Sequence, residues 1–283
     1  EKGDTTSHVT KQLALCYNKL GDTKNSEEWF SKHVAGGSAT SEEVYDYSMA
    51  LRGNEKYEES AKWMNVFSTM KSVDSRGKQF QEKEGLVEKL KSDGAKFEIK
   101  NLSSNSIYSD FAPMYYDEKM VFVSARLELK SMRRHHAWNN KPFLDLYEAQ
   151  KESDGELSGV SNLDRKVNTK YHEGPVSFTE DAKTVYFTRN NYFNRKYGTS
   201  TDKVNKLKVY RANLIDGEFK NIESLPFNND EYSVGHPSLT LDGKWLYFSS
   251  DMPGGKGGVD IYKGGVKSDG SFGTPINLGD KIT

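Results

Sequence analysis

The fold is decided by one stretch that occurs three times: Asp110-Phe-Ala-Pro-Met-Tyr-Tyr-Asp-Glu-Lys-Met-Val-Phe-Val-Ser124, Gly174-Pro-Val-Ser-Phe-Thr-Glu-Asp-Ala-Lys-Thr-Val-Tyr-Phe-Thr188 and Gly235-His-Pro-Ser-Leu-Thr-Leu-Asp-Gly-Lys-Trp-Leu-Tyr-Phe-Ser249. Each copy predicts a strand led by proline, a turn, and a second strand that ends in Phe and a small hydroxyl residue. The prolines, at positions 113, 175 and 237, lie 62 residues apart (175 − 113 and 237 − 175). A fixed period of this size indicates a repeat architecture.

Each unit continues with two more expected strands. The third strand ends in Asp145-Leu-Tyr147, Lys208-Val-Tyr210 or Asp260-Ile-Tyr262. An Asp-Gly turn that starts at position 154, 216 or 269 then leads into a fourth strand. Four short antiparallel strands per repeat, arranged radially, are typical of a β-propeller. The sequence thus predicts blades at about 106–167, 168–228 and 229–283, the first two lengthened by insertions.

The segment 97–105 is predicted to be the outer strand of a further blade. Its sequence, Phe97-Glu-Ile-Lys-Asn-Leu-Ser-Ser-Asn105, is similar to the fourth-strand stretch that begins at Phe219. Such a strand closes the ring of a propeller by completing its last blade. Three blades do not close, because a propeller needs at least four. We therefore expect 96–283 to be an incomplete propeller and the chain to be part of a longer one.

Residues 1–95 contain no proline and carry apolar residues at helical spacing, which predicts paired helices. Equivalent positions of two helical pairs lie 34 residues apart, as in Tyr17 and Leu51, Ser26 and Ser60, and Phe30 and Met64. A period of 34 in paired helices is typical of tetratricopeptide repeats. A third helical stretch is expected at about 75–92. The predicted fold class is a tetratricopeptide-like helical domain (1–95) followed by a partial β-propeller (96–283).

The composition excludes several classes of partner and site. The chain has 40 basic and 41 acidic residues and a formal net charge of −1, so a nucleic acid is not expected as a partner. Cys16 is the sole cysteine, which excludes an intrachain disulfide; it lies in an apolar helical stretch and is expected to be buried. No apolar run has the length of a membrane helix. The start at Glu1, without a signal peptide or lipid-attachment motif, is interpreted as processed or trimmed.

The candidate binding residues lie in two loops, 126–141 and 189–203, which join the second and third strands of the first two blades. Such loops emerge on one face of a propeller, and in adjacent blades they lie side by side. Arg, Trp and Tyr are favoured at protein-recognition hot spots, and function often resides on loops held by a rigid scaffold. The predicted partner-binding residues are Arg133, Arg134, Trp138, Tyr192, Phe193, Arg195 and Tyr197. The alternatives are that these loops fold over the blades or the helices, or that they bind an acidic glycan or a nucleic acid.

No catalytic, metal or cofactor site is predicted. His135 and His136 are adjacent and point apart on an extended chain, and no third ligand has a suitable spacing. The Asp-Gly pairs are typical of hairpin turns rather than calcium loops, and the glycine-rich segment 253–258 lacks the phosphate-binding spacing. Neither Gly-x-Ser-x-Gly nor His-Glu-x-x-His occurs. We therefore predict that the chain is not an enzyme.

Two stretches resemble a known family of repeats: Asn105-Ser-Ile-Tyr-Ser-Asp-Phe-Ala-Pro113 with Val121-Phe-Val-Ser-Ala-Arg126, and Phe248-Ser-Ser-Asp-Met-Pro-Gly-Gly-Lys-Gly-Gly-Val-Asp-Ile-Tyr262. They are similar to the TolB-type, WD40-like (PD40) propeller repeats of OmpA-family lipoproteins from Bacteroidota. Such proteins run from a lipoprotein signal through tetratricopeptide repeats and a propeller to a carboxypeptidase-regulatory-like domain and an OmpA-like domain. The resemblance covers nearly the whole chain and implies a periplasmic protein associated with the outer membrane. PorE-like members serve type IX secretion and gliding motility.

The resemblance and the two loops together predict a non-enzymatic, protein-binding scaffold. Its expected partners are other envelope proteins, held in the groove of the helical domain and on the propeller face. A link to peptidoglycan is implied only for an OmpA-like domain outside this chain. The alternative prediction is a propeller module that binds glycan or peptidoglycan fragments.

Overall fold

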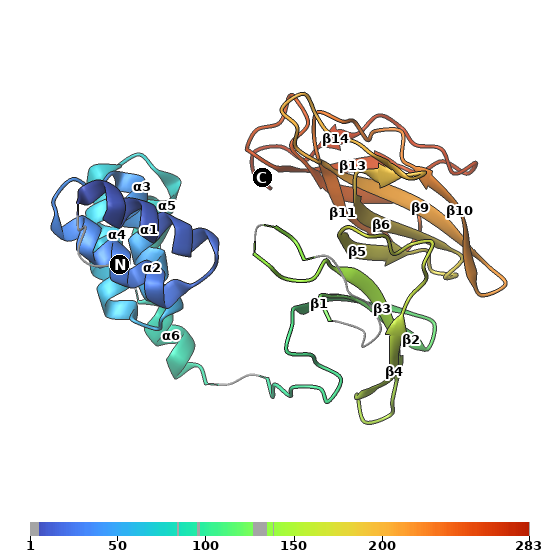
Figure 1. Ribbon diagram of the computed structural model, residues 1–283, viewed down its shortest axis with the longest axis horizontal. Helices are drawn as coiled ribbons and strands as arrows, with labels where there is room; N and C mark the ends of the chain where they lie inside the picture. The colour runs from blue at the N-terminus through green and yellow to red at the C-terminus, as the bar shows by residue number, and fades with distance from the viewer. Residues whose placement is uncertain (1–5, 84, 95–96, 127–134, 138, 283) are drawn as a thin grey trace. The chain divides into compact units, whose positions relative to one another are not determined.

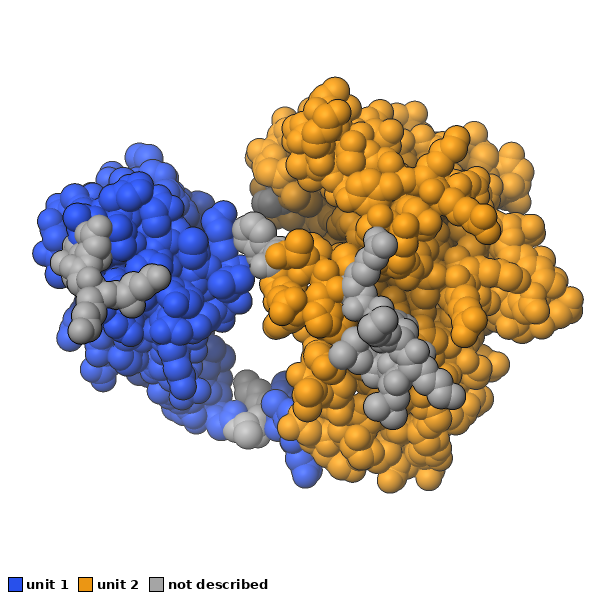
Figure 2. All heavy atoms as spheres, viewed as in Figure 1, with its two compact units in different colours: residues 1–99 blue, residues 100–283 orange. Residues whose placement is uncertain are grey.

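The structure is a computed structural model that divides into two compact units, Glu1–Ile99 and Lys100–Thr283. Figure 2 colours the two units separately. The described residues are 6–83, 85–94, 97–126, 135–137 and 139–282. The sequence placed the boundary between residues 95 and 96.

The first unit is helical (Figure 1). Its helices are α1 (Ser7–Lys19), α2 (Thr23–Ala35), α3 (Ser41–Gly53), α4 (Tyr57–Met70), α5 (Ser75–Glu82) and α6 (Leu86–Ser92). Thr40 and Glu43 form a capping box at the start of α3, which satisfies backbone N–H groups that have no partner within the helix. Among the described helices, none is long and apolar enough to cross a membrane.

The 34-residue period of the helices appears as a repeated contact. The Ser26 hydroxyl on α2 donates to the carbonyl of Ala14 on α1 at 3.4 Å. Thirty-four residues on, the Ser60 hydroxyl on α4 donates to the carbonyl of Ser48 on α3 at 2.8 Å. A small side chain at this position lets the two helices of each pair approach closely. The helical repeat is therefore present in three dimensions, while its assignment to the tetratricopeptide family stays a prediction.

One expectation for this unit is refined and one is wrong. The third helical stretch, expected at about 75–92, is present as two short helices, α5 and α6; Gly85, in the left-handed conformation (φ 76°), is the N-cap of the second. Cys16 is exposed rather than buried. The buried face of α1 is instead formed by Thr10 and Ala14, which lie one turn apart.

The second unit contains three four-stranded antiparallel sheets, each with its strands in sequence order from one edge to the other. The first has β1 (Asp110–Tyr116), β2 (Lys119–Ser124), β3 (Asp145–Lys151) and β4 (Leu157–Asn162). The second has β5 (Glu173–Phe178), β6 (Thr184–Asn190), β9 (Leu207–Ile215) and β10 (Glu218–Ser224). The third has β11 (Val234–Leu239), β12 (Trp245–Ser250), β13 (Asp260–Gly265) and β14 (Ile276–Asn277). Four-stranded antiparallel sheets of this order are the blades that the repeats predict (Figure 1).

The register of the strands corrects two details of the predicted repeat. The Asp/Lys-x-Tyr triplets lie at the beginnings of the third strands, not at their ends. The second strand of the first blade is also shifted by one residue: Ser124 is equivalent to Arg189 and Ser250, not to Thr188 and Ser249. With this register, a Phe on the second strand faces a Tyr on the third in every sheet. The pairs are Phe122–Tyr147, Phe187–Tyr210 and Phe248–Tyr262, with ring centroids 6.1, 5.8 and 5.9 Å apart.

The sheets are held together by apolar side chains on their facing surfaces. Strand β5 lies against β1, β2 and β3, and β11 lies against β5, β6 and β9. One core joins the first and second sheets through Val121, Leu146, Val176 and Phe187. A second core joins the second and third sheets and includes Phe248. The first strand of the second sheet, β5, and the first strand of the third sheet, β11, therefore each lie against the preceding sheet.

Asparagine side chains fix the connections between blades. The Asn168 amide donates to the carbonyl of Leu146 on β3 and accepts from its N–H, both at 2.8 Å. Asn228 makes the same two bonds to Val209 on β9. Each asparagine amide therefore bonds to one residue of the third strand of the preceding blade in the way that the backbone of a neighbouring strand would.

The segment 97–105, predicted as a closing strand, contains no strand in this structure; because the prediction placed its partner strands outside this chain, the closing role stays a prediction. Phe97 and Ile99 are 83% and 92% exposed, so their side chains pack on no sheet. Leu102 is half-buried and packs against a cluster on the first sheet that includes Phe122 and Tyr147. A strand forms only beside a partner backbone, and the described strands all pair within the three sheets or the hairpin β7–β8.

Candidate functional site

The loop 189–203 of the second blade carries a small hairpin, β7 (Tyr192–Phe193) and β8 (Lys196–Tyr197). The turn residues Asn194 and Arg195 both have positive φ (49° and 64°), which turns the chain back within two residues. Asn205 fixes the base of the hairpin: it accepts from the Asn191 N–H at 2.9 Å and donates to the Gly198 carbonyl at 2.7 Å. Tyr192 and Phe193 are half-buried, whereas Arg195 and Tyr197 are exposed.

The loop 126–141 of the first blade is described only in part. Arg133, Arg134 and Trp138, three of the predicted partner-binding residues, lie outside the described residues. His135 forms a β-bridge with Pro142, and the His136 N–H donates to the Lys141 carbonyl at 2.8 Å. The described end of this loop is therefore folded back on itself.

The two loops meet in a group of rings that we call the aromatic loop cluster. Its members are His136, Phe143, Tyr171, His172, Tyr192 and Tyr197. The rings of His136 and His172 are 5.0 Å apart, and Tyr171 lies 5.1 Å from Tyr192 and 4.8 Å from Tyr197. Tyr171 thus joins the hairpin of the second blade to the end of the first-blade loop.

Sequence reasoning placed the two loops side by side but missed the residues that join them. Phe143, Tyr171 and His172 were not among the candidates. One sequence signal could have identified Tyr171. An Asn-x-x-Tyr pattern precedes the first strand of each blade, and Tyr171 is its tyrosine in the second blade.

His172 is a half-buried polar group of the aromatic loop cluster. Its Nδ1 accepts the N–H of Leu144 at 3.1 Å. Burial, with a smaller contribution from the neighbouring His136, lowers the pKa of His172 to about 4. The ring is therefore neutral at physiological pH. The described residues offer no hydrogen-bond partner to His136 Nδ1, although that atom is buried.

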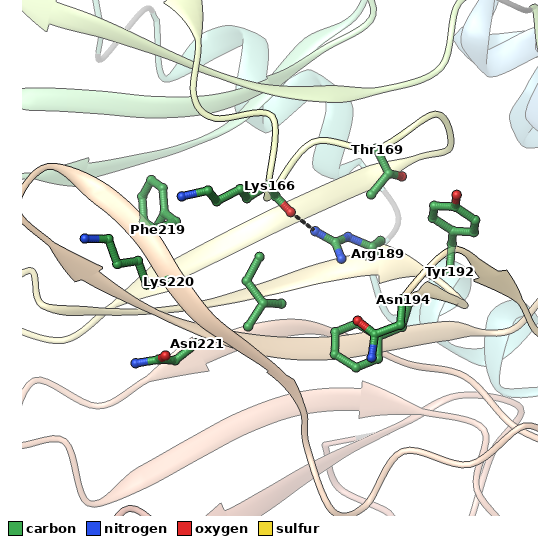
Figure 3. Close-up of a pocket in the computed structure, with 10 residues that line it drawn as sticks. Lys166, Thr169, Arg189, Tyr192, Asn194, Phe219, Lys220 and Asn221 are labelled. Atoms are coloured by element: carbon green, nitrogen blue, oxygen red, sulfur yellow. Dashed lines mark hydrogen bonds between the residues drawn. The ribbon is translucent and has the colours of Figure 1, made fainter.

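A pocket of about 510 Å³ lies beside the hairpin, in the second blade (Figure 3). It is lined by Lys166, Thr169, Arg189, Tyr192, Phe193, Asn194, Phe219, Lys220, Asn221 and Ile222. Figure 3 shows Lys166 and Lys220 on one side, Tyr192 and Asn194 on the other, and Arg189 between them. Two predicted residues, Tyr192 and Phe193, therefore line a cavity as well as forming the hairpin.

Arg189 and Glu173 form a buried pair behind this pocket. Arg189, on β6, is 3% exposed, and its guanidinium stacks over Phe187 and Tyr210 at 4.9 and 5.1 Å from the ring centroids. Its Nη2 donates to the carbonyls of Lys166 and Val167. Arg189 Nε lies 3.4 Å from Glu173 Oε1, outside hydrogen-bonding geometry. Nε of Arg189 and Oε2 of Glu173 are both buried without a hydrogen-bond partner among the described residues.

Burial dominates the electrostatics of this pair. It raises the pKa of Glu173 to about 8, with a further increase from Asp145, although Arg189 and the hydroxyl of Thr169 act in the opposite direction. Burial also lowers the pKa of Arg189, but that guanidinium still carries its charge at neutral pH. Burial therefore favours the protonated form of Glu173 beside a charged Arg189.

In the described part of the chain, no group of three or more His, Cys, Asp or Glu side chains is arranged to hold a metal ion. Asp216 and Gly217 both have positive φ (54° and 75°) in the turn between β9 and β10, as a two-residue hairpin turn requires. The Asp-Gly signal is thus explained there by a turn.

No family model matches the chain, and no curated protein matches it. Solved structures that it resembles include TolB from Acinetobacter baumannii, with 18% identity, a TM-score of 0.35, and coverage of 62% of this chain and 33% of that one. The putative TolB from Agrobacterium tumefaciens has 16% identity, a TM-score of 0.33, and coverage of 58% and 43%. A puromycin-hydrolysing peptidase of Mycobacterium tuberculosis has 11% identity, a TM-score of 0.37, and coverage of 61% and 24%.

The chain therefore spans less than half the length of each of these structures. Two of the three are TolB proteins, the propeller type to which the repeats are similar. Because the TM-scores are below 0.5, the assignment of blades rests on the sheets of this chain and not on these matches. The helical unit followed by antiparallel four-stranded sheets agrees with the predicted order, and no closed propeller is seen in the described residues.

The prediction that the chain is not an enzyme is contradicted by the same comparisons. The matches include peptidases: the puromycin-hydrolysing enzyme, a puromycin hydrolase, and a structure from a study of two prolyl endopeptidases. Identities of 11–18% assign no activity to this chain.

Proposed function

We propose that this chain is a protein-binding scaffold whose main contact surface is the aromatic loop cluster and the exposed tip of its hairpin. The observation that carries the proposal is that loops of two adjacent blades meet through edge-to-face and tilted ring contacts, and that the hairpin packed on these rings presents Arg195 and Tyr197. Tyr197 is 51% exposed although it contacts Tyr171. Ordered aromatic and arginine side chains at the surface favour protein recognition because little conformational freedom is lost on binding.

A second contact surface in this proposal is the groove of the helical unit. A cavity of about 760 Å³ lies between the α3–α4 pair and the segment α5–α6. Its walls combine apolar side chains, such as Tyr45, Met49 and Phe80, with charged ones, such as Arg52 and Glu88. A groove of this kind suits an extended or helical segment of another protein.

We also propose the protein family and the cellular location of this chain. In this reading the helices are a tetratricopeptide-like arm and the sheets are blades of a TolB-like propeller from an OmpA-family lipoprotein of Bacteroidota. The protein would act in the periplasm at the outer membrane, in a PorE-like role in type IX secretion and gliding, and an OmpA-like domain would supply the link to peptidoglycan. Support comes from the motif lines at 105–126 and 248–262 and from the order of helices and blades.

The test is affinity capture from a cell-envelope fraction with three forms of the chain. The wild type should recover one or more proteins in stoichiometric amount, and the double variant Arg195→Ser/Tyr197→Ser should lose them. The control is Tyr115→Ser, which removes a tyrosine of similar exposure, 53%, from β1 outside the cluster. Equal recovery by all three forms would refute the proposed surface. Binding of muropeptides without any protein would favour the alternative function, a glycan-binding module.

A further inference from the structure

The pocket beside the hairpin has an unusual charge distribution. It presents three basic side chains, those of Lys166, Arg189 and Lys220, and none of the described residues that line it is acidic. Glu218 and Asp216 contact the two lysines from outside the pocket, at 3.0 and 3.8 Å. Those acidic side chains are exposed, 58% and 88%, so the pairs are weak and screened by solvent. The interior of the pocket is therefore electropositive.

The deepest of the three cations, Arg189, is incompletely paired, because the carboxyl group of Glu173 lies 3.4 Å from its Nε outside hydrogen-bonding geometry. Arg189 is 97% buried, and its Nη2 is committed to two backbone carbonyls. A buried cation that is incompletely paired is costly, since burial removes the water that would solvate it. An anion that enters the pocket would offset this cost.

The walls indicate what kind of anion fits. Phe219 and Tyr192 provide ring surfaces, and Asn194 and Asn221 provide amides that donate and accept hydrogen bonds. A volume of about 510 Å³ is within the range of pockets that hold small organic molecules. Because Nη2 of Arg189 is committed to two backbone carbonyls, its guanidinium would attract a carboxylate by charge and not through a bidentate fork. A ligand with an apolar body and one carboxylate uses all of these features.

We propose that this pocket binds a small organic carboxylate, with its carboxylate group on Arg189, Lys166 and Lys220 beside it, and its body against Phe219 and Tyr192. This binding site does not depend on the protein-binding surface proposed above. The carboxylate belongs either to the end of a short peptide or to an acidic sugar. Both sources share the chemistry that the pocket recognises.

Glu173 makes the binding dependent on pH. The groups that face this carboxyl group are Arg189 on β6, Asp145 at the start of β3 and the Thr169 hydroxyl; Tyr210 on β9 faces Arg189. Because the pKa of Glu173 is raised to about 8, it is protonated at pH 6 and leaves the charge of Arg189 available. At pH 9 it is ionised and neutralises Arg189, so the affinity for an external carboxylate should fall.

The test is isothermal titration calorimetry with the whole chain and two matched pairs of probes. One pair is N-acetylglycylglycine and its terminal amide; the other is glucuronate and glucose. At least one carboxylate should bind at pH 6, about tenfold or more tighter than its uncharged counterpart, as the loss of a charged hydrogen bond implies. The pair that shows the difference identifies the peptide or the sugar source. Equal binding of both members of each pair, or no binding at all, would overturn the proposal.

Four variants then locate the site without removing Arg189, whose loss endangers folding. Lys166→Glu/Lys220→Glu should weaken carboxylate binding about tenfold or more. Lys183→Glu, a charge reversal in the β5–β6 turn at a side chain 77% exposed, should not. Glu173→Gln should bind equally at pH 6 and pH 9, whereas the wild type weakens. Equal effects of the lysine variants, or identical pH profiles of Glu173→Gln and the wild type, would contradict the site. Arg195→Ser/Tyr197→Ser should retain carboxylate binding, since neither residue lines the pocket.

Discussion

Asp110 in the first blade and Glu173 in the second occupy equivalent positions, each on the first strand opposite the equivalent residues Ser124 and Arg189. Asp110 accepts hydrogen bonds from Arg126 at 2.8 Å, from Ser124 at 2.6 Å, and from the N–H and hydroxyl of Ser106. Burial opposes ionisation of Asp110, but these hydrogen bonds prevail and lower its pKa. Glu173 accepts one from the Thr169 hydroxyl at 2.8 Å, and burial raises its pKa to about 8.

Both blades place an arginine guanidinium over an equivalent pair of aromatic rings, but the two arginines come from different positions in the sequence of the blade. Arg126 lies two residues beyond Ser124, yet its guanidinium stacks over Phe122 and Tyr147 at 5.0 and 5.2 Å. Arg189 stacks in the same way on the equivalent rings of the second blade. The arginine of the first blade reaches its carboxylate in hydrogen-bonding geometry, and the arginine of the second does not. One blade thus contains a satisfied ion pair, and the other contains an unsatisfied cation at the wall of a pocket.

The largest expected effect comes from removing the buried arginine. Arg189→Met should lower the free energy of unfolding by about 3 kcal/mol, because it leaves the carbonyls of Lys166 and Val167 without the hydrogen bonds that Nη2 donates. Arg126→Met, in the better hydrated pair, should cost about 1 kcal/mol. Urea denaturation of both variants measures the difference. Equal losses would show that the two pairs are energetically alike.

The next effect concerns the pH dependence of stability. The pKa of Glu173 in the folded protein, about 8, lies above its value in the unfolded chain. The contribution of Glu173 to the free energy of unfolding is therefore fully present below about pH 4.5 and is lost as the pH rises through 8. Between pH 5 and pH 9 the free energy of unfolding of the wild type should fall, relative to that of Glu173→Gln, by more than about 1.4 kcal/mol, which is the equivalent of one pKa unit. Denaturation curves at pH 5, 7 and 9 test this. A constant difference between the two forms would mean that Glu173 titrates normally.

Asp110→Asn should give the opposite sign. The folded pKa of Asp110 is lowered, so its stabilisation is present above its unfolded pKa, near 4, and is lost as pH falls. The variant should therefore be less stable than the wild type at pH 7, by about 1 kcal/mol, and the difference should shrink towards pH 3. The same denaturation series measures it. A difference that grows as the solution is acidified would contradict the assignment of Asp110 as the ionised member.

The smallest effect is expected at the hydroxyl that supports Glu173. Thr169→Val removes the hydrogen bond to Glu173 Oε1 and should cost about 0.5 kcal/mol at pH 7. Because that bond lowers the pKa of Glu173, the midpoint of the stability change should also move to higher pH. Ser106→Ala in the first blade, which removes the equivalent hydroxyl at Asp110, should not move any transition near pH 8. A shift of the same size in both variants would show that the comparison between the blades does not hold.

Much of the fold followed from local patterns. The prolines at 113, 175 and 237, the Asp-Gly turns and the alternating apolar residues predicted three four-stranded units, and the helical spacing predicted paired helices. Two register details were wrong because neighbouring positions such as Val123 and Ser124 look equally suited to end a strand. Only pairing with Leu146 and Asp145 distinguishes them.

The candidate site was predicted less completely. The hairpin loop was found from Tyr192, Phe193, Arg195 and Tyr197, since basic and aromatic residues mark a recognition loop in the sequence itself. The rings that join the loops were not, because Tyr171 lies in a connection and gains its role only where two blades meet. The pocket could not be inferred either: its lining comes from the connection before β5, from β6, from the hairpin and from β10.

The sequence by itself determined the periods, the strand order and the turns, because these depend on residues close together in the chain and on the conformations that they favour. The tertiary structure alone decided that the pKa of Asp110 is lowered while that of Glu173 is raised, and that Arg189 lines a cavity. Burial and hydrogen-bond partners set these properties, and both are supplied by residues from separate strands and connections.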